Sequence, residues 1–557
     1  MTSTSATSPA SGPVAAPASS TAAADLVIVG ARVLTQDPAN PVATAVAIRG
    51  GRILAVGSDA DVRQYAGPRT EVVDATGHVV TPGLTDCHQH PVLGSEMARG
   101  ADLVGADTLG ELRARLTAHA ALVGPDGWVV GYGGEYGAFA GRTMHRDLID
   151  DAVGGRPAFI WMSDAHSALM NTEALRRAGI TGPREFADRA EIVCDDRGPT
   201  GELHEQGATS LGYAAVPPMD GAELAARVTA LFAEQAKLGV TGVHVLDDGP
   251  GTAATLTALA GSGELAMRVR WAPWCPPGEV DNLAQRISDL RKAIGPDGLL
   301  RLAAVKFFAD GAIDGGGAWL QEPDCCGESH RSQWKDIARY ADAVAIAAAN
   351  GLPAWTHAIG DKAVAHTLDT YAHTPAPLGT RHRVEHAEVL QDPEITRFAA
   401  LDVVASMQPT HMDWSLPDQS DNWSTRVGPE RAALAWRYAD ILRAGGRVAL
   451  GSDWPVAAFD PRRTLAGAQL RRPAGESGRA PYGSSPGITA VQALAGYTTE
   501  AAYAAGEKGH AGRVAPGHYA DLTVFADDPT RVTPDDAARL PVTATLVAGA
   551  FTHRTEI

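Results

Sequence analysis

The middle of the chain alternates apolar segments with amphipathic segments, and this alternation constrains the fold more than any other feature. The apolar segments are rich in β-branched residues and predict strands, while stretches such as 334–350 and 428–444 predict helices. Strands that alternate with helices form a parallel sheet covered by those helices. The predicted strands are "VTGVHVLDD" (240–248), "AMRVRWAPW" (266–274), "RLAAVKFFADG" (301–311), "LPAWTHAIGD" (352–361), "HRVEHAE" (382–388), "DVVASMQPT" (402–410) and "GRVALGSDWP" (446–455).

Together with a strand that ends at His88, these segments make eight, the number that closes a (β/α)8 barrel of the TIM type. Two more candidates, "GWVVGYGG" (127–134) and "RPAFIWMSD" (156–164), exceed that number. We therefore predict an α/β fold whose barrel, over residues 81–512, contains an insertion at about 100–220. That segment is long and rich in loops.

Both ends of the chain differ from its middle, because they contain short strands separated by turns. The segments 25–80 and 513–557 are predicted to pair into one small composite β-sandwich domain. Residues 1–24 consist largely of Ala, Ser, Thr and Pro, and they predict a disordered leader.

Composition excludes several classes of partner. Acidic residues exceed basic ones by 65 to 47, and a net charge of -18 repels nucleic acid. No window approaches 18 uninterrupted apolar residues, so no membrane span is expected. The 5 cysteines are irregularly spaced, which predicts a reduced, cytoplasmic protein. We expect a small-molecule ligand, and a homodimer is compatible with the sequence.

Two histidines, His88 and His90, end the stretch "TPGLTDCHQH" (81–90). Side chains two positions apart on a strand share a face, so the two imidazoles could hold one metal ion. The alternative is a pair of surface histidines in a polar loop.

Further polar residues lie near the carboxyl ends of the predicted strands, which converge on one face of a parallel barrel. Imidazoles with a carboxylate suit Zn²⁺ or another borderline divalent ion. Alternatives remain for each: His386 could be a core histidine, and Asp453 could cap a helix. The lysine would need a partner, because an unpaired buried ammonium is costly. These residues are Lys306, His357, His386 and Asp453.

The ordered motifs "PGLTDCHQH", "VKFFADGA", "THAIGD", "RVEHAE", "SMQPTH", "GSDWPV" and "APGHYADLTVF" resemble the amidohydrolase superfamily, in particular its amidohydrolase-3 (YtcJ-like) branch. The resemblance covers almost the whole chain from Asp25 onward. The loop "GYGGEYGAFAGR" and the "DAH" segment are similar to N-substituted formamide deformylases.

The resemblance implies a (β/α)8 barrel and a two-metal site. His88 and His90 would ligate one ion, and His357 and His386 the other. Lys306 would bridge the ions as a carbamate, and Asp453 would be both a ligand and the general base. An unmodified Lys306 would instead fit a single ion. Zn²⁺ is the expected metal, with Mn²⁺ or Co²⁺ as alternatives.

The implied reaction is hydrolysis of a carbon–nitrogen bond in an amide, formamide or cyclic amide by metal-activated hydroxide. Alternatives are a deaminase or cyclic amidohydrolase that acts on a heterocycle, and a regulatory protein on the same scaffold without catalysis. His166 and His411 match catalytic positions typical of the branch. The residues expected to line the substrate pocket are Glu135, Trp161, Trp274, Trp319, Asp361 and Gln408.

Overall fold

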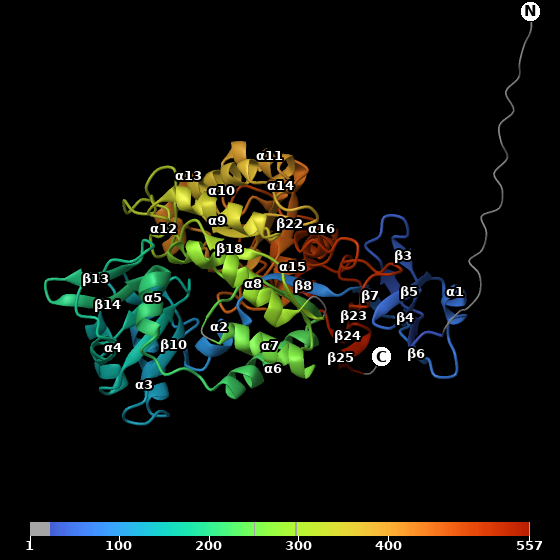
Figure 1. Cartoon of the computed structure of the whole chain (residues 1–557), viewed down its shortest axis with the longest axis horizontal. Helices are drawn as coiled ribbons and strands as arrows, with labels where there is room; N and C mark the ends of the chain where they lie inside the picture. The colour runs from blue at the N-terminus through green and yellow to red at the C-terminus, as the bar shows by residue number, and fades with distance from the viewer. Residues whose placement is uncertain (1–22, 250, 296–297, 556–557) are drawn as a thin grey trace, which may run out of the picture.

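The computed structural model describes residues 23–249, 251–295 and 298–555 (Figure 1). The predicted disordered leader lies outside the described residues except for Ala23 and Ala24. Ala24 is buried, and its backbone N–H donates to the carbonyl of Tyr65 at 2.8 Å. The packed part of the chain therefore begins at or before Ala24. Among the described helices, none is both long and apolar enough to cross a membrane.

Two parallel sheets form the centre of the molecule, and the predicted strands after residue 240 all contribute to them. One sheet has the order β17-β16-β15-β8 and the other β18-β19-β20-β21-β22. Single parallel bridges join the sheets at both edges: Trp274, after β16, pairs with Lys306 of β18, and Gln89 of β8 pairs with Trp454, after β22. The strands are β8 (Leu84–Gln89), β15 (Val240–Val245), β16 (Arg268–Trp271), β17 (Leu300–Leu302), β18 (Val305–Phe308), β19 (Ala354–Ala358), β20 (Arg383–His386), β21 (Val404–Met407) and β22 (Arg447–Leu450).

Helices connect most of these strands, which confirms the α/β class. In α9 (Ile337–Ala349), the buried residues Tyr340, Ala343, Val344 and Ala347 recur at helical spacing, so one face packs into the largest hydrophobic core. Other connecting helices are α6 (Gly221–Lys237), α7 (Thr252–Ser262), α8 (Leu283–Ile294), α10 (Asp361–His373), α11 (Asp392–Ala400), α15 (Pro461–Leu470) and α16 (Ala490–Tyr497).

The continuous helix predicted over 428–444 is wrong, because the segment forms two short helices, α13 (Pro429–Ala432) and α14 (Tyr438–Arg443). Trp436 lies between them with a φ of 46°, which ends helical geometry. The backbone N–H of Trp436 donates to the carbonyl of Glu388 at 2.8 Å, and its buried indole stacks on Trp423. Tertiary contacts therefore override the local helical pattern.

The two extra strand candidates lie in a separate mixed sheet of order β13-β14-β12-β11-β10-β9. Figure 1 shows this segment, in teal, on one side of the parallel sheets. The segment comes between β8 and β15 in the chain, but β8 and β15 pair directly with each other, so its strands belong to neither parallel sheet. Its strands are β9 (Ala101–Asp102), β10 (Val129–Gly134), β11 (Ala158–Met162), β12 (Ser167–Met170), β13 (Glu191–Asp195) and β14 (Gly198–His204).

Strands from the two ends of the chain share a six-stranded sheet of order β25-β24-β23-β7-β2-β3. In the antiparallel pair β7 and β23, Pro82 lies opposite Leu522, and Figure 1 shows the blue and red strands close together. A second sheet of N-terminal strands has the order β5-β4-β1-β6. The strands are β1 (Leu26–Val29), β2 (Arg32–Leu34), β3 (Val42–Ala43), β4 (Ala45–Arg49), β5 (Arg52–Gly57), β6 (Glu71–Asp74), β7 (Val79–Pro82), β23 (Leu522–Phe525), β24 (Val542–Val547) and β25 (Ala550–Arg554).

Candidate active site

The contact between the end of β8 and the segment after β22 brings Asp453 to the two histidines of the HxH motif. The backbone N–H of Asp453 donates to the carbonyl of His88 at 2.8 Å. The Nε2 atoms of His88 and His90 lie 3.3 Å and 3.2 Å from Asp453 Oδ1. His88 is in β8 itself, whereas His90 precedes the helix α2 (Pro91–Met97). The structure therefore brings His88, His90 and Asp453 together at the strand ends.

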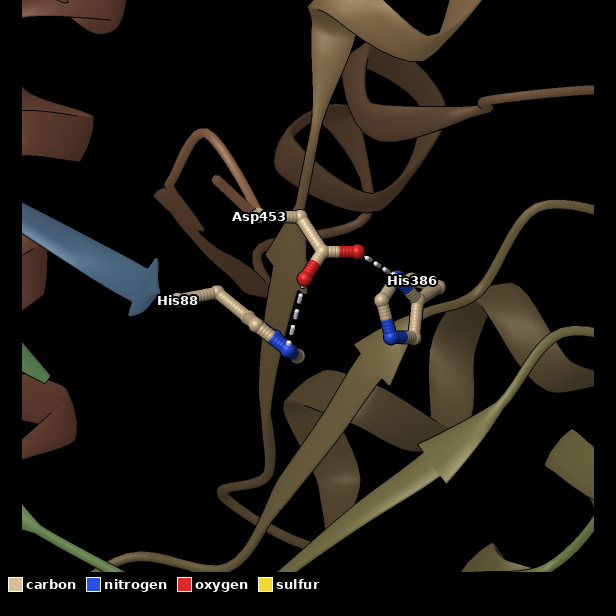
Figure 2. A group of neighbouring side chains, drawn as sticks. All are labelled: His88, His386 and Asp453. Atoms are coloured by element: carbon tan, nitrogen blue, oxygen red, sulfur yellow. Dashed lines mark ion pairs between the residues drawn. The ribbon is translucent and has the colours of Figure 1, made fainter. Parts of the chain in front are cut away.

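The other oxygen of Asp453 faces two more histidines. Nδ1 of His386, at the end of β20, lies 3.8 Å from Asp453 Oδ2, and Nε2 of His411 lies 3.6 Å away. Figure 2 shows His88 and His386 on either side of the Asp453 carboxylate. Among the described residues, His88, His386 and Asp453 could hold a metal ion, and so could His386, Glu388 and His411.

The backbone at this point departs from ordinary strand geometry. His386 and Asp453 have φ values of 72° and 61°, in the left-handed region that non-glycine residues seldom adopt. Each costs about 1–3 kcal/mol, and such residues cluster at functional sites.

Lys306 and His357 come from the neighbouring strands β18 and β19 and complete the cluster. Lys306 is fully buried, and its Nζ has no hydrogen-bond partner. Burial lowers the pKa of this lysine to about 8, against the raising effect of Glu385 and Asp453. The imidazole of His357 lies 4.5 Å from that of His386, measured between ring centroids.

Each of four histidines donates its Nδ1 proton to a carboxylate. His88 pairs with Glu385 at 2.8 Å and His90 with Asp247 at 3.0 Å. A carboxylate in this position fixes the imidazole tautomer and orients Nε2 toward a metal. The other two pairs are His166 with Glu205 at 2.9 Å and His411 with Glu388 at 3.2 Å.

These four carboxylates were not among the site residues predicted from the sequence. Glu385 and Glu388 flank His386 in the "VEHAE" stretch, and Asp247 is the second residue after β15. Their positions near strand ends were a usable signal. Glu205 follows β14, outside the parallel sheets, so no strand-end rule points to it.

The electrostatic environment keeps several of the imidazoles neutral, the form that binds metal. Burial and the nearby charge of Lys306 hold the pKa of His88 well below its usual value. Burial likewise lowers the pKa values of His357 and His386. For His90, burial is outweighed by the hydrogen bonds to Asp247 and Asp453, so its pKa rises to about 9. For Asp453, neighbouring imidazoles outweigh burial and lower the pKa.

The donor set fits a bound metal ion. Several nitrogens here are buried without any hydrogen-bond partner, and leaving a buried polar atom unpaired costs about 1–3 kcal/mol. A cation among them would satisfy the lone pairs of the imidazoles together, and Lys306 would join them only after losing its proton. The atoms are Nε2 of His88, His357 and His411, Nδ1 of His386 and Nζ of Lys306.

A cavity of about 1020 Å³ opens over these residues, and its wall includes side chains of the insertion. Glu135, Trp161 and Trp274 line it, as do the predicted catalytic residues His166 and His411. The His166 ring lies 4.8 Å from that of His357, so the segment that contains the mixed sheet reaches the histidine cluster.

Three residues expected at the pocket are not among those that line the cavity. Trp319 packs against His366 outside the cavity. It lies in the loop after β18, which leads away from the strand ends. Gln408 is buried and its Nε2 approaches the carbonyl of Ser406. Asp361 accepts the backbone N–H of Gln321 at 2.8 Å, a structural role at the start of α10.

Comparison with known proteins agrees with this geometry. The chain is 27% identical to the "Putative amidohydrolase YtcJ" of Bacillus subtilis, over 91% of this chain and 96% of that protein. It is 27% identical to the "N-substituted formamide deformylase" of Arthrobacter pascens, over 95% and 98% of the two chains. The crystal structure of an uncharacterized metal-dependent hydrolase from Pyrococcus horikoshii has the same fold, with a TM-score of 0.70 and 22% identity over 91% of this chain and 99% of that one. The sequence model of the amidohydrolase family matches residues 71–553, so the chain belongs to the amidohydrolase family.

Proposed function

We propose that this protein is a metal-dependent hydrolase that cleaves the carbon–nitrogen bond of an amide, formamide or cyclic amide. One observation carries the proposal: five buried nitrogens without hydrogen-bond partners belong to side chains that line one large cavity together with Asp453. A structural cluster of histidines would pair these atoms with protein groups or leave them in contact with solvent.

The ligand assignment follows the resemblance to amidohydrolases. His88 and His90 would hold one ion, His357 and His386 would hold a second, and Asp453 would contribute a carboxylate oxygen. Lys306 would react with CO₂ and release a proton to give a carbamate, an anionic oxygen ligand in place of the unpaired buried ammonium. Without that reaction, the site holds a single ion. A bound Zn²⁺, Mn²⁺ or Co²⁺ lowers the pKa of water from about 15.7 to about 7 and polarises the substrate carbonyl.

The chain's own residues move the protons and orient the substrate. Asp453 accepts a proton from the attacking water and returns it to the leaving nitrogen, because its two oxygens face opposite sides of the histidine cluster. His166 and His411, each held by a carboxylate, orient the reacting carbonyl from the cavity wall. Trp161 and Trp274 pack against the rest of the substrate, and Glu135 contacts it.

The finer architecture is part of the proposal. We infer that the two parallel sheets close into one eight-stranded barrel, with β17 and β18 as successive parts of a single strand. The bridges at both junctions support this closure. The segments 25–80 and 513–557 then form one composite β-sandwich domain, and the insertion occupies about 100–220.

Metal analysis and a substrate screen test the function. Protein prepared without chelator should contain one or two divalent ions per chain and lose activity after chelation. Zn²⁺, Mn²⁺ or Co²⁺ should restore that activity. The screen compares aryl formamides with hydantoins and amino-heterocycles.

Turnover of the ring compounds alone would favour a deaminase or cyclic amidohydrolase. Protein that binds no stoichiometric metal, or activity that chelators leave unchanged, would contradict the proposal. Metal-loaded protein without any activity would favour the non-catalytic regulatory alternative.

A further inference from the structure

The wall of the cavity has a strongly one-sided charge. Among the described residues that line it, Lys306 is the only lysine or arginine, and this side chain belongs to the metal cluster. Acidic residues are numerous over the same surface. A charged group of the ligand that lies away from the metal cluster would therefore face carboxylates alone.

Three of these carboxylates, Glu135, Asp164 and Asp314, have no basic partner among their described hydrogen bonds. Asp164 accepts a hydrogen bond from the Tyr136 hydroxyl at 2.7 Å, and Asp314 accepts one from the Nδ2 amide of Asn422 at 2.9 Å. Both donors are neutral, so no cationic side chain compensates these acidic groups. Elsewhere in this chain, carboxylates commonly pair with arginine, as Asp535 does with Arg472 at 2.8 Å.

The three side chains lie close enough to affect one another. Burial raises the pKa of Glu135 to about 7, and the charges of Asp107 and Asp164 add to this effect. Burial also raises the pKa of Asp314 to about 7, with contributions from Asp164, Glu388 and Glu135. Glu135 and Asp164 belong to the insertion, whereas Asp314 follows β18. The insertion and the segment after β18 thus bring acidic side chains together at the cavity wall, and a ligand cation would stabilise their ionised forms.

Aromatic side chains cover much of the remaining wall. The rings of Trp274 and Phe308 meet edge to face near the metal cluster, with 5.3 Å between centroids. On the insertion side, Trp161 packs on Tyr213 at 5.5 Å. Trp161 is only 6% exposed, and its buried Nε1 has no hydrogen-bond partner. This unpaired donor is independent evidence that the cavity takes a ligand.

We propose that the substrate is an aromatic amide without any anionic group, and that a positive charge remote from the scissile bond improves its use. The aromatic part packs between the insertion and Trp274, and the remote end faces Glu135, Asp164 and Asp314. The proposal rests on the hydrolase function above and specifies its substrate class. It excludes amides of amino acids with a free carboxylate and ring substrates that carry an acid side chain.

The physical argument compares two regions of the cavity. Bound cations offset negative charge only near the scissile bond, where the polarised carbonyl lies. At the remote end, an anionic group would lose hydration and meet several carboxylates, whereas an ammonium would be attracted by them. Aromatic faces also attract cations, which adds to the preference.

Three formamides that differ only in one para substituent provide the test. They are N-(4-methylbenzyl)formamide, which is neutral, N-[4-(aminomethyl)benzyl]formamide, which is cationic, and 4-(formamidomethyl)benzoate, which is anionic. Water cleaves each into formate and the corresponding protonated amine. With the metal-loaded protein, kcat/KM should be highest for the cationic compound and about tenfold or more lower for the anionic compound than for the neutral one.

Dissociation constants of the same compounds separate the two proposals. If the order of charges holds in binding but nothing is hydrolysed, the hydrolase function fails and the charge preference stands. If the compounds are hydrolysed equally well, or the anionic compound best, the charge preference is overturned and the hydrolase function stands. If the anionic compound binds at least as tightly as the others without turnover, both fail.

Matched substitutions locate the preference. Asp314→Asn and Glu135→Gln keep side-chain shape, and each should reduce the ratio of kcat/KM for the cationic over the anionic compound by about three- to tenfold. Glu223→Gln removes the same charge from the exposed first turn of α6 and should leave the ratio unchanged. An unchanged ratio in both cavity variants, or an equal change in Glu223→Gln, would overturn the assignment.

Discussion

Replacing Glu385 by glutamine should weaken metal binding although this residue is not assigned as a ligand. Glu385 is completely buried, and its Oε2 accepts a proton from His88 Nδ1 and another from Arg383 Nη2, each at 2.8 Å. Its Oε1 lies 2.8 Å from Arg383 Nε. Glutamine preserves the shape, but it removes the charge and turns one acceptor atom into a donor.

The expected magnitudes follow from these contacts. Loss of the carboxylate that orients a ligating histidine lowers metal affinity by about 10- to 100-fold, which is roughly 1.4–2.7 kcal/mol. Breaking the buried pair with Arg383 leaves a guanidinium without its counter-charge, and such a loss costs about 3–5 kcal/mol of stability. Competition with a chromophoric chelator measures the affinity, and thermal unfolding of the metal-free protein measures the stability.

Two further variants separate these effects. Glu507 is another buried glutamate, with 2.8 Å to Arg270, but it lies away from the histidine cluster. Glu507→Gln should lower Tm without changing the metal dissociation constant. Adding Arg383→Met to Glu385→Gln should recover part of the lost stability but none of the affinity. The reasoning is refuted if Glu385→Gln binds metal as tightly as the parent, or if Glu507→Gln weakens binding equally.

Three other predictions concern catalysis, pH and the N-terminus. Asp453→Asn should lower kcat by about 10²- to 10⁴-fold with little change in Tm, because asparagine tolerates the left-handed φ of 61°; retained activity would remove Asp453 as the base. Burial lowers the pKa of His382 from its usual 6.5 to about 4. Between these two pH values the unfolded chain therefore binds a proton at His382 that the folded chain does not. Stability should therefore fall by roughly 1.4 kcal/mol per pH unit through this window, and His382→Asn should show a smaller loss of Tm on acidification; equal losses would exclude this histidine. Deleting residues 1–22 should leave kcat/KM and Tm unchanged, whereas deletion through Ala24 should lower Tm because the hydrogen bond to Tyr65 is lost; a large activity loss in the shorter deletion would show that the N-terminal segment contributes to the active protein.

Sequence patterns alone located the strands of the parallel sheets and the polar residues at their ends. The period-2 and period-3.6 patterns are local, because each element must turn its apolar side toward the core. Residues such as His88, His386 and Asp453 were predictable for the same reason, since they interrupt apolar strands at their carboxyl ends. The shared sheet of the two chain ends was expected from the similarity of their β-rich segments.

The tertiary structure decided which side chains meet, and this information is not local. Asp453 reaches His88 only because the segment after β22 lies beside β8, and Glu205 reaches His166 only through the fold of the insertion. Trp319 lies 13 residues after Lys306 in the sequence, but it packs against His366 outside the cavity. Periodicity specifies the inward face of each element, whereas the charge of the cavity wall depends on how distant loops pack together.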